Sequence, residues 1–111
     1  MNPVKPIFVH LEPHEKLMLK DNSNGLSVFL KALTFEKDII SSFISELDAE
    51  KQKERTCTRI RIDEDVLTSL SRLRSYLSDN FAFNPTTQEL YWLTCRYLSS
   101  KFPGYRDFNL T

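Results

Sequence analysis

Apolar and polar residues alternate most clearly between positions 56 and 62 of this 111-residue chain. Successive side chains of an extended segment point to opposite faces, so the alternation separates two sets of residues. One face carries Thr58, Ile60 and Ile62. The other face carries Cys57, Arg59 and Arg61. The pattern predicts a strand that buries its isoleucine face and leaves its arginine face in solvent or against a ligand.

Two helical patterns follow this strand. Apolar residues recur every three or four positions from Val66 to Leu77, which predicts an amphipathic helix. Asp63 suits the N-cap of that helix, and Ser-Asp-Asn at 78–80 is expected to end it. The second helix is expected to begin at Pro85 or Thr86, because Thr86 and Glu89 have the spacing of a capping box. Its apolar stripe runs from Leu90 to Phe102, and Pro103-Gly104 stops it.

The N-terminal half repeats this order of elements without repeating the residues. Segment 6–11 alternates as a second strand, with Ile7, Val9 and Leu11 on one face and Phe8 and His10 on the other. A short helix that opens at 12–15 and runs through Lys20, and a break at 22–25, are expected next. A long amphipathic helix from Leu26 to about 50 follows, and a charged linker then leads to 55.

A strand of about six residues is not stable alone, so strand 57–62 needs a partner strand. Two arrangements satisfy this need. Strand 6–11 could pair with it inside one chain, which gives a single-chain pseudo-dimer, or the 57–62 strands of two chains could pair in a homodimer. Either way, the expected fold is mainly α-helical with a short two-stranded antiparallel ribbon. The expected division is an N-terminal segment, 1–55, and a C-terminal strand-and-helices unit with a short tail, 56–111.

Residues 56–102 resemble the ribbon-helix-helix domains of the Arc, methionine-repressor and plasmid copy-control repressor families. The resemblance is carried by the alternation at 58–62, the acidic start at 63–65 and the helix that opens at 85–87. It implies a small sequence-specific DNA-binding protein, such as a repressor, an antitoxin-type regulator or a plasmid or phage accessory factor. In that family the ribbon enters the major groove, and the second helix holds a phosphate at its N-terminus.

The resemblance also implies roles for individual residues. Base contacts are expected from Arg59 and Arg61, with Cys57 beside them on the same face. Phosphate contacts are expected from Thr86 and Thr87. If segment 6–11 supplies the second strand, Phe8 and His10 become its contact residues.

The net charge of the chain bears on the expectation of DNA binding. Fifteen basic and fifteen acidic residues give a net charge of zero, which is unlike a strong nonspecific nucleic-acid binder. Residues 1–55 have a net charge of −1 with mostly lysine as the basic type, and residues 56–111 have +1 with mostly arginine. The neutral balance and the 12% aromatic content keep an alternative open, a protein-interaction module such as a small phage- or plasmid-encoded inhibitor.

Other chemistry is not indicated by the sequence. Cys57 and Cys95 match no metal or redox spacing and are expected to be reduced thiols. Pro13 separates His10 from His14, so a shared helical metal site is not expected. No catalytic motif, cofactor motif, apolar membrane span or signal peptide is recognisable. The sequence therefore favours a non-enzymatic cytoplasmic protein without a cofactor.

Overall fold

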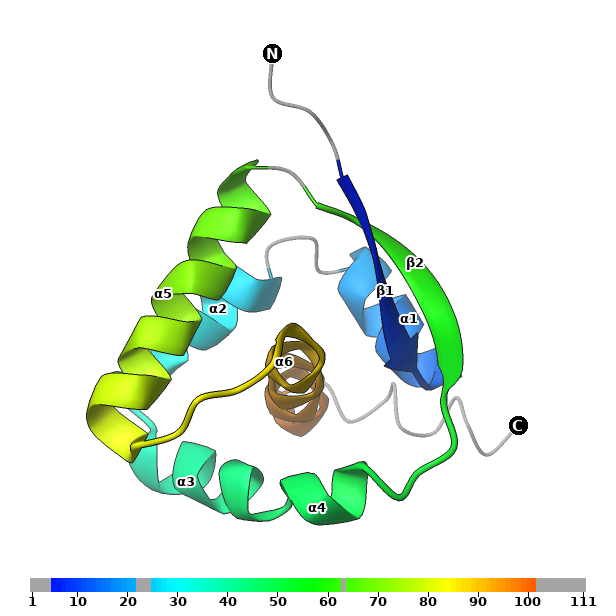
Figure 1. The fold of residues 1–111 in the computed structure, drawn as a ribbon. Coiled ribbons are helices and arrows are strands. Elements are labelled where there is room, and N and C mark those ends of the chain that lie inside the picture. Colours follow the sequence, from blue (N-terminus) through cyan, green and yellow to red (C-terminus); the bar gives the residue numbers. More distant parts are fainter. Residues whose placement is uncertain (1–4, 22–24, 63, 102–111) are drawn as a thin grey trace.

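The computed structural model describes residues 5–21, 25–62 and 64–101 of the chain. In this part, helices dominate and accompany one two-stranded antiparallel sheet (Figure 1). The elements in chain order are β1 (Lys5–Leu11), α1 (Pro13–Asp21), α2 (Gly25–Ala32), α3 (Lys37–Ser45), α4 (Leu47–Glu50), β2 (Thr56–Ile62), α5 (Glu64–Phe81) and α6 (Thr87–Lys101). The expected class, mainly α-helical with a short antiparallel ribbon, is confirmed.

Helix α6 lies at the centre of the molecule, and the other elements surround it (Figure 1). Its buried residues are Leu90, Tyr91, Leu93, Thr94, Cys95, Tyr97, Leu98 and Ser99. The described residues of the predicted apolar stripe are among them, and the buried surface extends beyond that stripe. Two of the buried hydroxyl groups on α6 have partners, since Thr94 Oγ1 donates to Leu90 O (2.8 Å) and Tyr97 OH donates to Glu36 Oε2 (3.0 Å). Satisfied hydroxyl groups of this kind can be buried at little cost.

The long helix expected from 26 to 50 is divided into α2, α3 and α4. A turn follows Ala32, whose carbonyl oxygen accepts hydrogen bonds from Phe35 N and Glu36 N (3.0 and 2.9 Å). A straight helix over this range would be roughly 37 Å long, whereas the 15 residues of α6 span about 22 Å. The bends allow apolar residues from Phe29 to Leu47 to pack against one central helix.

Helix α5 continues through Phe81, so the expected end at 78–80 was wrong. The chain leaves the helix at Ala82, whose φ of 51° lies in the left-handed region. Glycine is favoured there because it has no Cβ, and alanine takes the position in this chain. Phe83 N then donates to Leu77 O (3.3 Å), which directs the chain back toward α6.

The two strands pair within one chain, which is one of the two arrangements that the sequence left open. β1 and β2 are antiparallel, with Ile7 opposite Ile60 and Leu11 opposite Thr56. Val9 and Leu11 are buried and Ile60 packs against the same core, as the alternation predicted. The side chain of Ile62, the N-cap at Asp63, positions 22–24 of the predicted break and the stop at Pro103-Gly104 lie outside the described residues.

The segments 1–55 and 56–111 contribute to one core. Phe29 of α2, Leu33 in the turn after α2, Leu73 and Leu77 of α5 and Leu90 of α6 all belong to it. Within the described ranges, no helix has the length and apolar character needed to cross a membrane.

Candidate functional site

The outward face of the β1–β2 ribbon brings together four residues that the sequence singled out. In the strand register, Phe8 lies opposite Arg59 and His10 lies opposite Cys57. All four are exposed, whereas their strand neighbours Val9 and Leu11 are buried. We name this surface the ribbon face and define it by Phe8, His10, Cys57 and Arg59.

Arg61 also lies on β2, but only its backbone position is described. It pairs with Pro6 in the register, two residues beyond Arg59 on β2. Its side chain lies outside the described part of the structure, so its predicted base contact stays a prediction.

The guanidinium group of Arg59 differs from those of three other arginines. Arg96 is ion-paired with Glu46 (3.1 Å), Arg74 donates to Thr87 Oγ1, and Arg55 is held by several carboxylates. Among the described residues, Arg59 forms no ion pair. Its donors are therefore directed into solvent and are available to a ligand.

The first turn of α6 carries the predicted phosphate ligands, Thr86 and Thr87. Thr86 N donates to Glu89 Oε1 (2.9 Å) and Glu89 N donates to Thr86 Oγ1 (3.1 Å), so the predicted capping box is present. The Glu89 carboxylate thus occupies one donor at this N-terminus and adds negative charge, although Lys51 Nζ lies 3.4 Å from Glu89 Oε2. Arg74 brings a second cation to Thr87. Both threonine hydroxyl groups are thus already engaged, Thr86 Oγ1 by Glu89 N and Thr87 Oγ1 by Arg74.

The same turn of α6 is attached to the outer edge of β1. Gln88 exchanges two hydrogen bonds with the main chain of His10, and Trp92 Nε1 donates to His10 O (2.9 Å). No local sequence pattern predicted this contact, because it joins residues that are 78 and 82 positions apart.

A cluster of charged residues lies on the inner side of the molecule. Arg55 is its centre, with a side chain only 3% exposed. Arg55 Nε donates to Glu15 Oε1 (2.9 Å), and its Nη2 donates to Glu15 Oε2 (3.3 Å) and Glu50 Oε2 (3.2 Å). Its guanidinium group also lies 4.5 Å from the ring centroid of Trp92, a cation–π contact. The sequence analysis placed Arg55 in a charged linker and missed this role.

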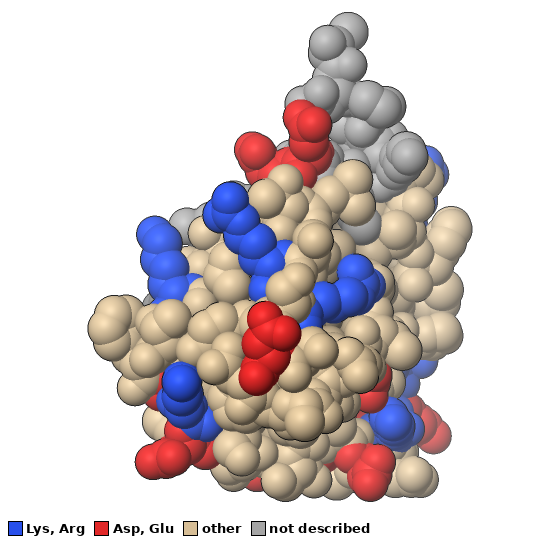
Figure 2. All heavy atoms as spheres, turned by 60° about the vertical axis from the view of Figure 1, so that its left-hand side comes forward, with Lys and Arg blue, Asp and Glu red and all other residues tan. Residues whose placement is uncertain are grey.

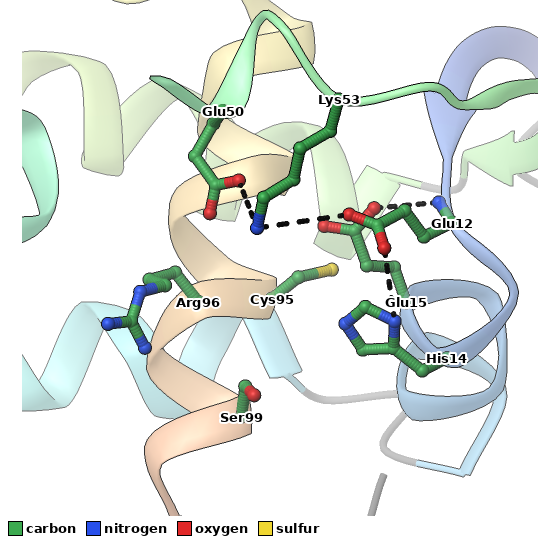
Figure 3. A pocket seen from close by; sticks show the side chains of 8 residues that line it. All are labelled: Glu12, His14, Glu15, Glu50, Lys53, Cys95, Arg96 and Ser99. Carbon is green, nitrogen blue, oxygen red and sulfur yellow. Dashed lines mark hydrogen bonds and ion pairs between the residues drawn. The ribbon is translucent and has the colours of Figure 1, made fainter. Parts of the chain in front are cut away.

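A small polar hollow lies beside this cluster (Figure 3). Lys53 reaches across it, with its Nζ 2.9 Å from Glu50 Oε2 and 4.0 Å from Glu12 Oε1. The hollow has a volume of about 20 Å³, which is room for roughly one water molecule. Such a volume cannot hold an organic substrate, so we regard the cluster as structural.

Burial and ion pairing act in opposite directions on the cluster. Burial favours the neutral form of Glu50, but hydrogen bonds and the charges of Lys53 and Arg55 outweigh it and lower the pKa of this carboxyl group. Burial likewise disfavours the charged form of Arg55, yet Glu15 and Glu50 raise its pKa. Cys95 lines the hollow, and burial raises the pKa of its thiol well above the usual range.

The histidines lie on different elements, His10 on β1 and His14 on α1. Within the described ranges, no three histidine, cysteine or acidic side chains are grouped as metal ligands. Figure 2 shows the side of the molecule that carries α5, where basic side chains are separated by acidic and uncharged ones. On its described part, this side shows no continuous basic stripe.

Comparison with known proteins identifies no family model, no curated protein and no solved structure that matches this chain.

Proposed function

We propose that the ribbon face binds double-stranded DNA in the major groove. The observation that carries the proposal is the exposed set Phe8, His10, Cys57 and Arg59 on one side of a two-stranded ribbon whose other side is anchored in the core. The major groove of B-DNA, about 12 Å wide, admits a two-stranded β-ribbon. Within this proposal, the fold is a single-chain variant of a ribbon-helix-helix domain.

The chemistry of Arg59 supports DNA over other ligands. A free guanidinium fork can donate two parallel hydrogen bonds to the O6 and N7 atoms of guanine. Arg61 follows at the same strand parity and is proposed to contact the next base pair. Cys57 and His10 form the other cross-strand pair of the ribbon face. Their side chains are proposed to contact base edges or methyl groups.

The neutral net charge sets the expected strength of binding. Arg59 and Arg61 are proposed to contact bases and Arg74 a phosphate, so about one phosphate charge is neutralised and log K should fall with log salt at a slope of only about −1. Sequence-specific contacts must then supply most of the discrimination. One chain contributes both strands, so one chain is expected to occupy one stretch of groove.

The test begins by selecting duplexes from a random library, followed by fluorescence anisotropy at two salt concentrations. The double variant Arg59→Ala/Arg61→Ala is expected to bind the selected duplex at least about tenfold more weakly, because each bidentate contact contributes roughly 1–3 kcal/mol. The matched control is Arg72→Ala, which removes an exposed arginine of α5 away from the ribbon. Failure of the wild-type protein to enrich any sequence, or full binding by the double variant, would contradict the proposal.

The same face supports a second candidate function, binding to another protein. Phe8 is 66% exposed, and large exposed aromatic side chains are enriched in protein interfaces. If the ribbon face binds a protein instead, no DNA binding is expected at low or at high salt concentration. This second candidate also predicts that Phe8→Ser, rather than the arginine double variant, abolishes capture of the partner.

A further inference from the structure

The main chain of His10 is held by side chains of α6 in the way that a third strand would hold it. His10 N donates to Gln88 Oε1, and His10 O accepts from Gln88 Nε2 and from Trp92 Nε1, each at 2.9 Å. A primary amide group has both a donor and an acceptor, so Gln88 copies the hydrogen bonds of a neighbouring strand residue. The open edge of β1 is thereby closed at this position.

This attachment also defines the pairing of His10 with Cys57. In an antiparallel pair, residues alternate between those that exchange backbone hydrogen bonds and those that do not. Because the backbone groups of His10 are directed to α6, His10 and Cys57 form a pair of the second kind. The side chains of such pairs approach more closely, and the contact from α6 acts at the edge of β1 beside this pair.

Trp92 connects the two strands at the same end of the ribbon. Its indole N–H reaches His10 on β1, and its ring lies 4.5 Å from the guanidinium group of Arg55, the residue that precedes β2. Arg55 is itself fixed by Glu15 and Glu50. The ribbon is thus attached to α6 where Leu11 pairs with Thr56.

We propose that Gln88 and Trp92 are positioning residues that set the ribbon face relative to the first turn of α6. This inference rests on the proposed DNA-binding function. Gln88 lies next to Thr87, which accepts a hydrogen bond from Arg74. The contact therefore fixes the separation between base-reading groups on the ribbon and the cation at the N-terminus of α6. With that separation fixed, one duplex engages both at once.

The first experiment does not need DNA. Amide hydrogen exchange of His10 is measured by NMR in the wild type and in Gln88→Ala, with Gln52→Ala as the control because Gln52 is an exposed glutamine outside both strands. Loss of the acceptor is expected to speed exchange of the His10 amide about tenfold. Exchange that stays unchanged in Gln88→Ala overturns the inference.

The second experiment measures binding to the selected duplex over a range of salt concentrations. Gln88→Ala is expected to bind about threefold to tenfold more weakly, with a salt slope shallower by about one, because one phosphate contact is lost. Trp92→Phe keeps a smaller aromatic ring near Arg55 and removes the indole N–H while Gln88 stays in place, so it should show a smaller effect of the same kind. A variant that is merely less stable would lower the fraction of active protein without changing the salt slope.

The outcomes separate this inference from the function on which it rests. If the wild type binds the duplex and Gln88→Ala binds it with the same affinity and slope, the positioning role is wrong while the function stands. If the wild type binds no duplex, the proposed function is wrong, and the positioning role falls with it.

Discussion

Two arginines that are only four residues apart in the sequence, Arg55 and Arg59, lie in opposite environments. Arg55 is enclosed by Glu15, Glu50 and the ring of Trp92, whereas Arg59 is exposed on the ribbon face. A cysteine accompanies each of them, since Cys95 lines the hollow beside the Arg55 cluster and Cys57 lies next to Arg59 on the ribbon face. The comparison shows that partners remote in sequence decide whether a charge is structural or available to a ligand.

The largest expected effect comes from removing Arg55. Arg55→Ala leaves Glu15 and Glu50 without their buried cation, and breaking such a pair costs about 3–5 kcal/mol of unfolding free energy. Arg59→Ala is the matched control and should change stability by less than about 0.5 kcal/mol. Urea denaturation measures both. Equal losses of unfolding free energy in the two variants would show that Arg55 contributes no more to stability than the exposed Arg59.

The two thiols should differ in reactivity. Cys57 is exposed and should react promptly with a disulfide reagent such as DTNB. Cys95 is buried with a raised pKa, so it should react only when the protein opens, at least about 100-fold more slowly. Stopped-flow absorbance resolves the two phases, and Cys57→Ser should abolish the fast one. Two fast phases in the native wild type would show that the cluster is open to solvent.

A smaller change in unfolding free energy is expected when the pH is lowered. The pKa of Glu50 is lowered in the folded protein, where burial opposes ionisation and Lys53 and Arg55 favour it more strongly. The folded state then binds fewer protons than the unfolded state, so this stabilisation is complete above the usual carboxyl pKa and is lost as the pH falls through the lowered value. Unfolding free energy should decline more steeply below about pH 4.5 in the wild type than in Glu50→Gln. Parallel pH profiles would mean that Glu50 is not part of the ion-pair network.

Local patterns predicted the local parts of this fold. The alternation at 56–62 indicated the opposite exposure of Arg59 and Ile60, and the spacing of Thr86 and Glu89 indicated the capping box. Both signals depend on backbone geometry within a few residues, where side-chain periodicity is reliable. The extension of α5 to Phe81 was missed because alanine, not glycine, occupies the left-handed position after it.

Local sequence patterns did not predict the contacts between segments that are distant in the chain. The apolar stripe from Leu26 to Leu47 fits one helix, whereas the structure divides this segment into α2, α3 and α4, each in contact with α6. Arg55 looked like one charge among several in a polar linker, because Glu15 lies 40 positions away. Gln88 carries no periodic or charge signal at all. For the candidate site, the sequence indicated the ribbon face but not the contacts that hold it.

The central place of α6 has a consequence for how the chain is made. The ribosome synthesises α6 after all the elements that surround it, so residues such as Phe29, Leu33 and Ile40 have no complete core to enter until residues 87–101 have emerged. Domains generally fold as units during synthesis, and exposed apolar surface favours aggregation in the meantime. A nascent chain stalled before α6 should therefore depend on chaperones, even though all residues of the ribbon face have already been made.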